Sequence, residues 1–180
     1  MGLEMSRELW LLRHGKAERY DGSEDYDRRL KKRGRRDVAN IAEWLKSREF
    51  HPDLLISSPA TRAIMTARIV CDVLDIDRQQ IQMEKRLYDE GLTRVKSVLV
   101  DCLANSARVL LVGHNPEFED LLTYLVAPKQ LPEVEKLLPT AAVAHLLLPD
   151  DWTKLAAGCA ELLSIISPKS LTEASDEELD

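Results

Sequence analysis

The sequence is poor in cysteine and in aromatic side chains, and it has no long hydrophobic run. Its 180 residues include three cysteines, at wide spacings and without a CxxC pair. This odd number predicts reduced thiols in a cytoplasmic protein rather than a disulfide framework. Aromatic residues make up 5% of the chain, too few for a platform that stacks nucleic-acid bases. No apolar run reaches transmembrane length, so we expect no membrane-spanning segment.

The charge balance is acidic. Lys and Arg total 25 and Asp and Glu total 31, which gives a formal net charge of -6 at pH 7. This argues against general binding to nucleic acid or to an anionic membrane. Hydrophobic residues make up 44% of the chain, enough for a core. We therefore expect one domain over residues 1–168, followed by an acidic, flexible tail over residues 169–180.

Short apolar runs alternate with helical patterns, which indicates an α/β fold. Strands are expected at residues 9–12, 54–56, 81–83, 109–112, 143–148 and 162–166. Helices are expected around residues 38–45, from Ser58-Pro59 to Leu74, over 95–103 and from Asn115-Pro116 onward. Ser58 suits an N-cap and Pro59 the first helical position. The last two strands are joined by a short connection, so we expect them to run antiparallel.

Four polar features directly follow expected strands. They are Arg13-His14-Gly15, Arg62, Asp89-Glu90 and Gly113-His114-Asn115-Pro116. In a parallel α/β sheet the ligand crevice lies at the carboxyl ends of the strands. The four features are therefore expected to meet in one pocket.

The residue types at these positions suit phosphoryl transfer. Arg13 and Arg62 each offer a planar fork of donors to an oxyanion. Gly15 lets the backbone approach a phosphate closely because it has no side chain. A neutral His14 can attack phosphorus, and a protonated His114 could hold a phosphate oxygen. The pattern predicts a phosphate pocket with a histidine nucleophile.

Three segments then carry a resemblance to a known family. They are Leu11-Leu12-Arg13-His14-Gly15-Lys16, Ser57-Ser58-Pro59-Ala60-Thr61-Arg62-Ala63 with Thr66-Ala67, and Val112-Gly113-His114-Asn115-Pro116. Together they resemble the signature blocks of the histidine phosphatase superfamily, also called phosphoglycerate-mutase-like. Two further segments look like its SixA-type branch: Asp27-Arg28-Arg29-Leu30 with Gly34, and Leu137, Pro139, Thr140 and Ala141. The resemblance covers about residues 8–166.

The resemblance implies a three-layer α/β/α sandwich with a mixed, mostly parallel sheet of about six strands. It also implies that His14 is the residue phosphorylated in the intermediate, with Arg13, Arg62 and His114 in the phosphate pocket. Larger members of the family have an acidic residue after the third strand that protonates the leaving group. Here Asp89 occupies that place, with Glu90 adjacent, and the sequence leaves open whether Asp89, Glu90 or neither of them is the general acid.

Two basic features near the pocket have more than one interpretation. Arg28 is a peripheral phosphate-binding candidate, because the proline that usually follows this arginine in the family is absent. Seven basic residues fall between Arg28 and Arg36. They form either a solvated helix start or a basic rim that attracts an acidic partner.

The remaining histidines have plainer interpretations, and a metal site has little support in the sequence. His51 and His145 are expected to be structural or solvated. Metal binding by His14, His114 and His145 lacks an HExxH or compact HxH pattern, and two arginines would repel a cation. We therefore expect no metal and no cofactor.

The predicted function is hydrolysis of phosphohistidine on a protein substrate. The gaps between Lys16 and Leu30 and between Leu74 and Tyr88 are too short for the large cap that encloses small substrates in bigger relatives. The alternatives are a phosphatase for small phosphate esters or a mutase, and a non-catalytic phosphate-binding module. The intact His14 beside two arginines weakens the last of these. The sequence does not determine the oligomeric state.

Overall fold

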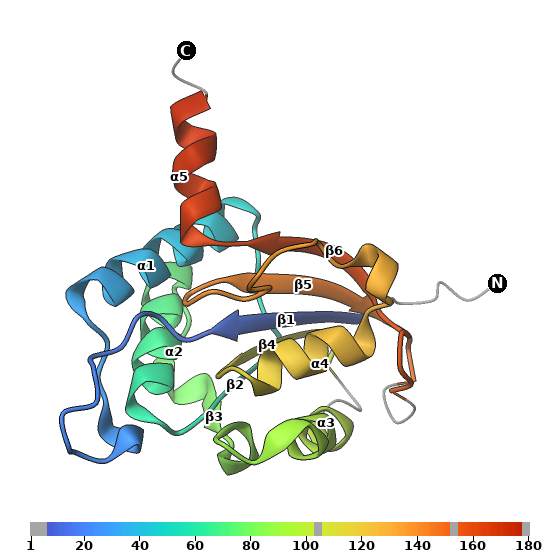
Figure 1. Ribbon diagram of the computed structural model, residues 1–180, viewed down its shortest axis with the longest axis horizontal. Helices are drawn as coiled ribbons and strands as arrows, with labels where there is room; N and C mark the ends of the chain where they lie inside the picture. The colour runs from blue at the N-terminus through green and yellow to red at the C-terminus, as the bar shows by residue number, and fades with distance from the viewer. Residues whose placement is uncertain (1–6, 103–105, 152–154, 178–180) are drawn as a thin grey trace.

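The computed structural model describes residues 7–102, 106–151 and 155–177, which form an α/β/α sandwich around a six-stranded sheet (Figure 1). The strands are β1 (Arg7–Arg13), β2 (Leu54–Ser57), β3 (Ile81–Met83), β4 (Arg108–Gly113), β5 (Val143–Leu148) and β6 (Glu161–Ile166). The α-helices are α1 (Lys32–Ser47), α2 (Thr61–Leu74), α3 (Gly91–Cys102), α4 (Glu117–Leu125) and α5 (Pro168–Glu177). Short 3-10 helices are η1 (Asp25–Asp27), η2 (Arg78–Gln80), η3 (Lys85–Leu87) and η4 (Pro128–Gln130).

The sheet has the order β3-β2-β4-β1-β5-β6. Strands β1 to β4 pair in parallel, β5 pairs antiparallel with β1, and β6 pairs antiparallel with β5. The predicted fold class and the antiparallel last pair are therefore confirmed. The register sets Arg13 opposite Gly113, so the segments that follow β1 and β4 leave the sheet side by side.

Alternation along β1 explains the two layers. Leu9 and Leu11 face a core with α3 and α4, while Trp10 and Leu12 face a core with α1 and α2. Successive side chains of a strand point to opposite faces, so an apolar run is buried on both sides. Figure 1 shows α1 with α2 and α3 with α4 on opposite sides of the sheet. Within the described residues, no helix is long and apolar enough to span a membrane.

Helix starts differ from the sequence-based expectation. Helix α2 begins at Thr61 with Ala60 as N-cap, not at Ser58. The Ser58 hydroxyl still accepts a hydrogen bond from the Ala60 N–H at 3.3 Å, but it also lies 2.7 Å from His114 Nε2. Helix α4 begins at Glu117, after a cis peptide bond between Asn115 and Pro116.

The expected acidic tail is also different. Residues 168–177, most of which were assigned to a flexible tail, form helix α5. Leu171 packs against the core that contains α1, and this apolar contact gives the helix an anchor. The far end of α5 points away from the sheet (Figure 1). Residues 178–180 of the expected tail and Leu103 of the expected third helix lie outside the described residues.

Candidate active site

The strands place the candidate residues at one edge of the sheet. Because Arg13 pairs with Gly113, His14 and His114 each follow directly, and the His14 N–H donates to the Gly113 carbonyl at 3.0 Å. Strand β2 lies on the other side of β4 and leads into α2, which carries Arg62 in its first turn. The arrowhead of β1 in Figure 1 points to this edge.

His14 is held in one orientation and one tautomer. Its side chain is buried, and Nδ1 lies 2.7 Å from the carbonyl oxygen of Gly15. A carbonyl only accepts, so Nδ1 carries the ring proton and Nε2 keeps its lone pair. The Arg62 Nε–H points at this Nε2 from 3.3 Å. The nitrogen able to attack phosphorus is thus defined, and an arginine stands beside it.

Gly15 lets helix α1 approach this histidine. Its N–H donates to Thr66 Oγ1 at 3.1 Å, which ties the strand end to α2. A Cβ at position 15 would lie 2.7 Å from the Gly34 carbonyl oxygen and 2.7 Å from a Val38 methyl group. Any larger residue would therefore push α1 and the His14 backbone apart.

His114 lies beside His14, with ring centroids 5.0 Å apart. Its Nε2 contacts Ser58 Oγ at 2.7 Å, while its buried Nδ1 has no hydrogen-bond partner among the described residues. Among the described residues the Ser58 hydroxyl proton has no other acceptor than His114 Nε2, so the hydroxyl donates to Nε2. Nδ1–H is then a donor available for a ligand.

Both histidines are neutral in this arrangement. Burial, followed by the charges of Arg62 and Arg13, lowers the pKa of His14 to about 3. Burial and the neighbouring His14 and Arg62 lower the pKa of His114 to about 2. His114 is therefore neutral in the unliganded site, chiefly because it is buried, and a protonated His114 that holds a phosphate oxygen stays a prediction.

Acidification should destabilise the fold. The pKa of each imidazole is near 6.5 when it is exposed in the unfolded chain, and it is lowered to about 3 for His14 and about 2 for His114 in the folded protein. The folded pKa values lie below the unfolded ones, so the stability is fully present above pH 6.5 and is lost progressively below it. The cost per histidine should be about half of 1.4 kcal/mol per pH unit near pH 6.5 and should approach roughly 1.4 kcal/mol per pH unit near pH 5. Urea unfolding between about pH 7 and pH 5, where most carboxylates stay ionised, measures this slope.

A His14→Asn variant is the matched control for this slope. It retains His114 and should show a shallower loss of unfolding free energy with falling pH than the unaltered protein. Identical slopes for the two proteins would show that His14 is not held neutral by the fold.

Arg62 is the centre of a polar network that the sequence analysis did not anticipate. Its Nη1 donates to the backbone carbonyl of Asp25 at 2.7 Å, and its Nη2 pairs with Asp25 Oδ2 at 3.0 Å. Arg28 binds the other carboxylate oxygen, with Nε at 2.8 Å and Nη2 at 2.7 Å. The Tyr88 hydroxyl donates to Oδ2 at 2.9 Å. Asp25 therefore joins η1 to α2 and to the segment before α3.

The charge of Asp25 is stabilised by these partners. Partial burial acts to raise its pKa, but hydrogen bonds from Tyr88 and Arg62 and the charge of Arg62 together lower the pKa to about 2. The carboxylate is therefore ionised at neutral pH. The sequence shows Asp25 only as one acidic residue in a polar loop, three positions before Arg28, so its role had no distinguishing signal.

Arg13 lies at the end of β1. Its Nη1 donates to the carbonyl of Leu138 at 2.9 Å, and its buried Nε has no hydrogen-bond partner among the described residues. Asn115 Nδ2 donates to the same carbonyl at 2.9 Å. The charge of Arg13 contributes to lowering the pKa of both His14 and His114. The structure thus brings Arg13, Arg62 and His114 together around His14, and it links Arg28 to them through Asp25.

The acidic candidates do not join this network. Asp89 is exposed and adopts a left-handed backbone conformation with φ of 52°, and among the described residues its side chain has no hydrogen bond or ion pair. Glu90 is exposed and pairs with Arg94 at 3.5 Å. A third carboxyl, Glu117, is buried at the start of α4, and burial raises its pKa. A general-acid role for Asp89 stays a prediction.

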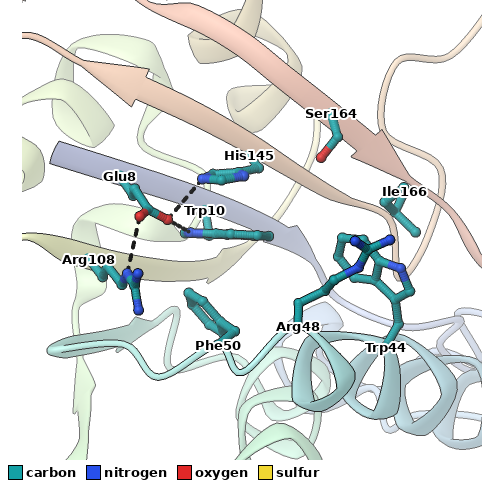
Figure 2. Close-up of a pocket in the computed structure, with 9 residues that line it drawn as sticks. All are labelled: Glu8, Trp10, Trp44, Arg48, Phe50, Arg108, His145, Ser164 and Ile166. Atoms are coloured by element: carbon teal, nitrogen blue, oxygen red, sulfur yellow. Dashed lines mark hydrogen bonds and ion pairs between the residues drawn. The ribbon is translucent and has the colours of Figure 1, made fainter. Parts of the chain in front are cut away.

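A separate cavity of about 430 Å³ lies towards the amino end of β1, on the α1 side of the sheet (Figure 2). The Glu8 carboxylate there accepts hydrogen bonds from Trp10 Nε1 at 3.1 Å, Arg108 Nε at 3.1 Å and His145 Nε2 at 2.9 Å. The His145 ring stacks on Trp10 with centroids 3.7 Å apart. These groups satisfy one another, which supports the structural role expected for His145. His51 is exposed, as a solvated residue would be.

No cluster of three or more His, Cys, Asp or Glu side chains that could hold a metal ion occurs within the described ranges. The polar groups around His14 are mostly arginines, which suit an anion rather than a cation. The donor set therefore fits phosphate chemistry.

Comparisons with known proteins show which family this chain resembles. The model of the histidine phosphatase superfamily (branch 1) matches residues 9–90. Phosphohistidine phosphatase SixA of Escherichia coli (strain K12) is 28% identical over 145 residues, which cover 79% of this chain and 86% of that protein.

Two solved structures extend the comparison. The protein histidine phosphatase SixA complexed with tungstate superposes with a TM-score of 0.76 at 25% identity, covering 91% of this chain and 99% of that one. A mycobacterial glucosyl-3-phosphoglycerate phosphatase has a TM-score of 0.65 at 19% identity and covers 88% of this chain and 98% of that one. The second likeness shows a shared fold.

Proposed function

From the premise that the chain belongs to the histidine phosphatase superfamily, in its SixA-type branch, and is a phosphatase, we propose that it hydrolyses phosphohistidine on a protein substrate. His14 is the nucleophile and carries the phosphoryl group in the intermediate. The observation that carries this proposal is the state of His14, which is neutral, has its proton fixed on Nδ1 and presents Nε2 beside Arg62.

In the first step, the Nε2 lone pair of His14 attacks phosphorus. The substrate ring takes a proton from solvent on its other nitrogen before the attack, the bond between phosphorus and the substrate nitrogen breaks with its electron pair left on that nitrogen, and the ring departs as neutral imidazole. The Nδ1–H of His14 donates to the Gly15 carbonyl, which stabilises the positive charge that develops on the ring. In the second step, a water molecule attacks phosphorus, the bond to Nε2 breaks, and neutral His14 is restored with release of phosphate.

The phosphoryl oxygens are bound by donors that surround Nε2. Arg62 points its Nε–H at His14 Nε2, and His114 Nδ1 and Arg13 Nε are buried donors without a partner in the described residues. Donors of this kind stabilise the charge on the transferring phosphoryl group in the transition state. The guanidinium groups supply the positive charge that a metal provides in other phosphatases, so we expect activity without added metal.

The surroundings of the site support a protein substrate. The connection from β1 to α1 contains only the short helix η1, and the connection from α2 to α3 contains η2, β3 and η3. Neither includes an inserted domain that could close over a small metabolite. Five basic side chains of the Arg28–Arg36 segment, which leads from η1 into α1, are exposed: Arg29, Lys32, Arg33, Arg35 and Arg36. They favour a partner with an acidic surface.

The proposal predicts a higher kcat/KM for a protein or peptide phosphorylated on histidine than for any sugar phosphate tested. Phosphate release is measured in buffer containing EDTA, and the enzyme is quenched in parallel to detect an acid-labile phosphoryl group. A faster reaction with a sugar phosphate would contradict the protein substrate but leave the His14 chemistry intact. Transfer to a second substrate instead of water would indicate a mutase, and no phosphoenzyme with no turnover would indicate a binding module.

A further inference from the structure

A row of paired residues forms the floor of the cavity towards the amino end of β1 (Figure 2). Trp10 pairs with His145 of β5, and His145 pairs with Ser164 of β6, so the three side chains lie on the same face of the sheet. Trp44 in the last turn of α1 and Phe50 beyond the end of that helix supply the wall. The cavity therefore lies where α1 ends, over a part of the sheet that the helix does not cover.

The floor of the cavity is preformed because its polar groups satisfy one another. The Glu8 carboxylate accepts hydrogen bonds from three neighbours, which are Trp10, Arg108 and His145. Partial burial acts to raise the pKa of Glu8, but the hydrogen bonds from Trp10 and Arg108 lower it, so the group is ionised at pH 7. Burial lowers the pKa of His145, so its ring is neutral at this pH. A ligand would meet this surface without having to reorganise it.

Two polar groups of the lining have no such partner. The guanidinium carbon of Arg48 lies over the Trp44 ring, 5.4 Å from its centroid, and among the described residues no carboxylate pairs with Arg48. A guanidinium over a ring keeps its in-plane N–H donors available. The Ser164 hydroxyl also has no hydrogen bond within the described ranges. Because Glu8 and Arg108 pair with each other, the lining carries one unpaired positive charge, that of Arg48.

Volume and charge together define the ligand that fits this cavity. A volume of about 430 Å³ is in the range of sites for small molecules, and the aromatic lining favours a planar ring. One free guanidinium matches one carboxylate, because its fork of donors can bind both oxygens. A phosphate monoester carries nearly two negative charges at pH 7 and would leave part of its charge unpaired. The lining therefore favours an aromatic compound with a single carboxylate.

We propose that this cavity is a binding site for a planar aryl carboxylate, whose ring packs on the aromatic lining and whose carboxylate pairs with Arg48. The site is separate from the catalytic pocket. Trp10 and Arg13 belong to the same strand and lie three residues apart, which is roughly 10 Å. The inference does not depend on the substrate of the phosphatase.

The test uses naphthalene-2-carboxylate and its neutral isostere naphthalene-2-carboxamide as probes. Binding to the full chain is followed by NMR through the indole N–H signals of Trp10 and Trp44. The carboxylate should shift these signals with a Kd of about 1 mM or tighter, the scale for a ligand of this size. The carboxamide should bind roughly fivefold more weakly, because it leaves Arg48 unpaired.

The same titrations are repeated with inorganic phosphate at a concentration that saturates the catalytic pocket. The Kd of the carboxylate should not change, since the two sites are separate. Loss of the shifts in the presence of phosphate would place the probe in the catalytic pocket and would overturn the inference.

Three variants identify the contacts. Arg48→Gln alters an exposed side chain, and it should raise the Kd of the carboxylate roughly fivefold and leave that of the carboxamide within about twofold. Lys46→Gln is the matched control, because Lys46 is an exposed cation in the same turn of α1 but pairs with Asp75 outside the lining. It should leave both Kd values unchanged. Ser164→Leu places a bulkier side chain in the cavity and should abolish binding of both probes.

Hydrolysis of p-nitrophenyl phosphate confirms that each variant is folded, since none of these residues belongs to the catalytic pocket. Equal weakening of both probes by Arg48→Gln would show that the guanidinium does not select the carboxylate, which would overturn the inference. Unchanged binding in an active Ser164→Leu protein would place the probes elsewhere. The absence of saturable shifts in the unaltered protein would show that the cavity does not bind an aryl carboxylate.

Discussion

His14→Ala is expected to reduce turnover by about a millionfold, the scale measured when an enzyme loses its nucleophile. His14 Nε2 is a neutral nitrogen whose lone pair is exposed to an arginine-rich pocket, and the variant removes it. Transition-state binding by Arg62 and Arg13 would remain, which explains a small residual rate. Phosphate release from a phosphohistidine peptide measures the loss, and the acid-labile phosphoenzyme should be absent.

The fold should survive this substitution. The backbone of residue 14 keeps its hydrogen bond to Gly113, and the β1–β4 pairing does not involve the imidazole. Circular dichroism and urea unfolding at pH 7.5 or so provide the check. His51→Ala serves as the matched control because His51 is exposed, and it should retain full activity. Turnover within a hundredfold of normal in a folded His14→Ala protein would exclude His14 as the nucleophile.

Arg62→Ala is expected to lower kcat/KM by roughly a hundred- to thousandfold, the usual effect of removing one donor from an oxyanion site. The guanidinium is almost fully buried, and it contacts the nucleophile and Asp25 at the same time. Arg62→Lys should recover little of the activity, because an ammonium is a single point charge and cannot contact His14 Nε2, the backbone carbonyl of Asp25 and Asp25 Oδ2 at the same time.

Steady-state kinetics with the phosphohistidine peptide test this expectation. Arg68→Ala is the control, since Arg68 belongs to the same helix but is exposed. Near-normal kcat/KM in Arg62→Ala, or full rescue by lysine, would mean that the planar fork of Arg62 does not bind the phosphoryl group. The acid-labile phosphoenzyme should still form slowly in Arg62→Ala, which distinguishes it from His14→Ala.

Local sequence determined the parts of this protein that depend on neighbouring residues. The apolar alternation in residues 9–12 specified a strand buried on both faces, and the polar residues that follow it were placed correctly at the sheet edge. The position of Arg62 in the first turn of a helix followed from its distance behind a strand. Such features need only a periodicity or a spacing, which one segment contains.

Tertiary structure decided the features that join distant segments. Asp25 gained its role through Arg62 and Tyr88, which are 37 and 63 positions away, and nothing in its own loop marks it. Ser58, which was expected to be a helix N-cap, contacts His114. Leu171 packs on the core, and this contact stabilises helix α5 in an acidic segment. Charge pairing and apolar burial between segments that the sheet brings together stabilise these contacts. Propensity within a segment therefore could not predict them.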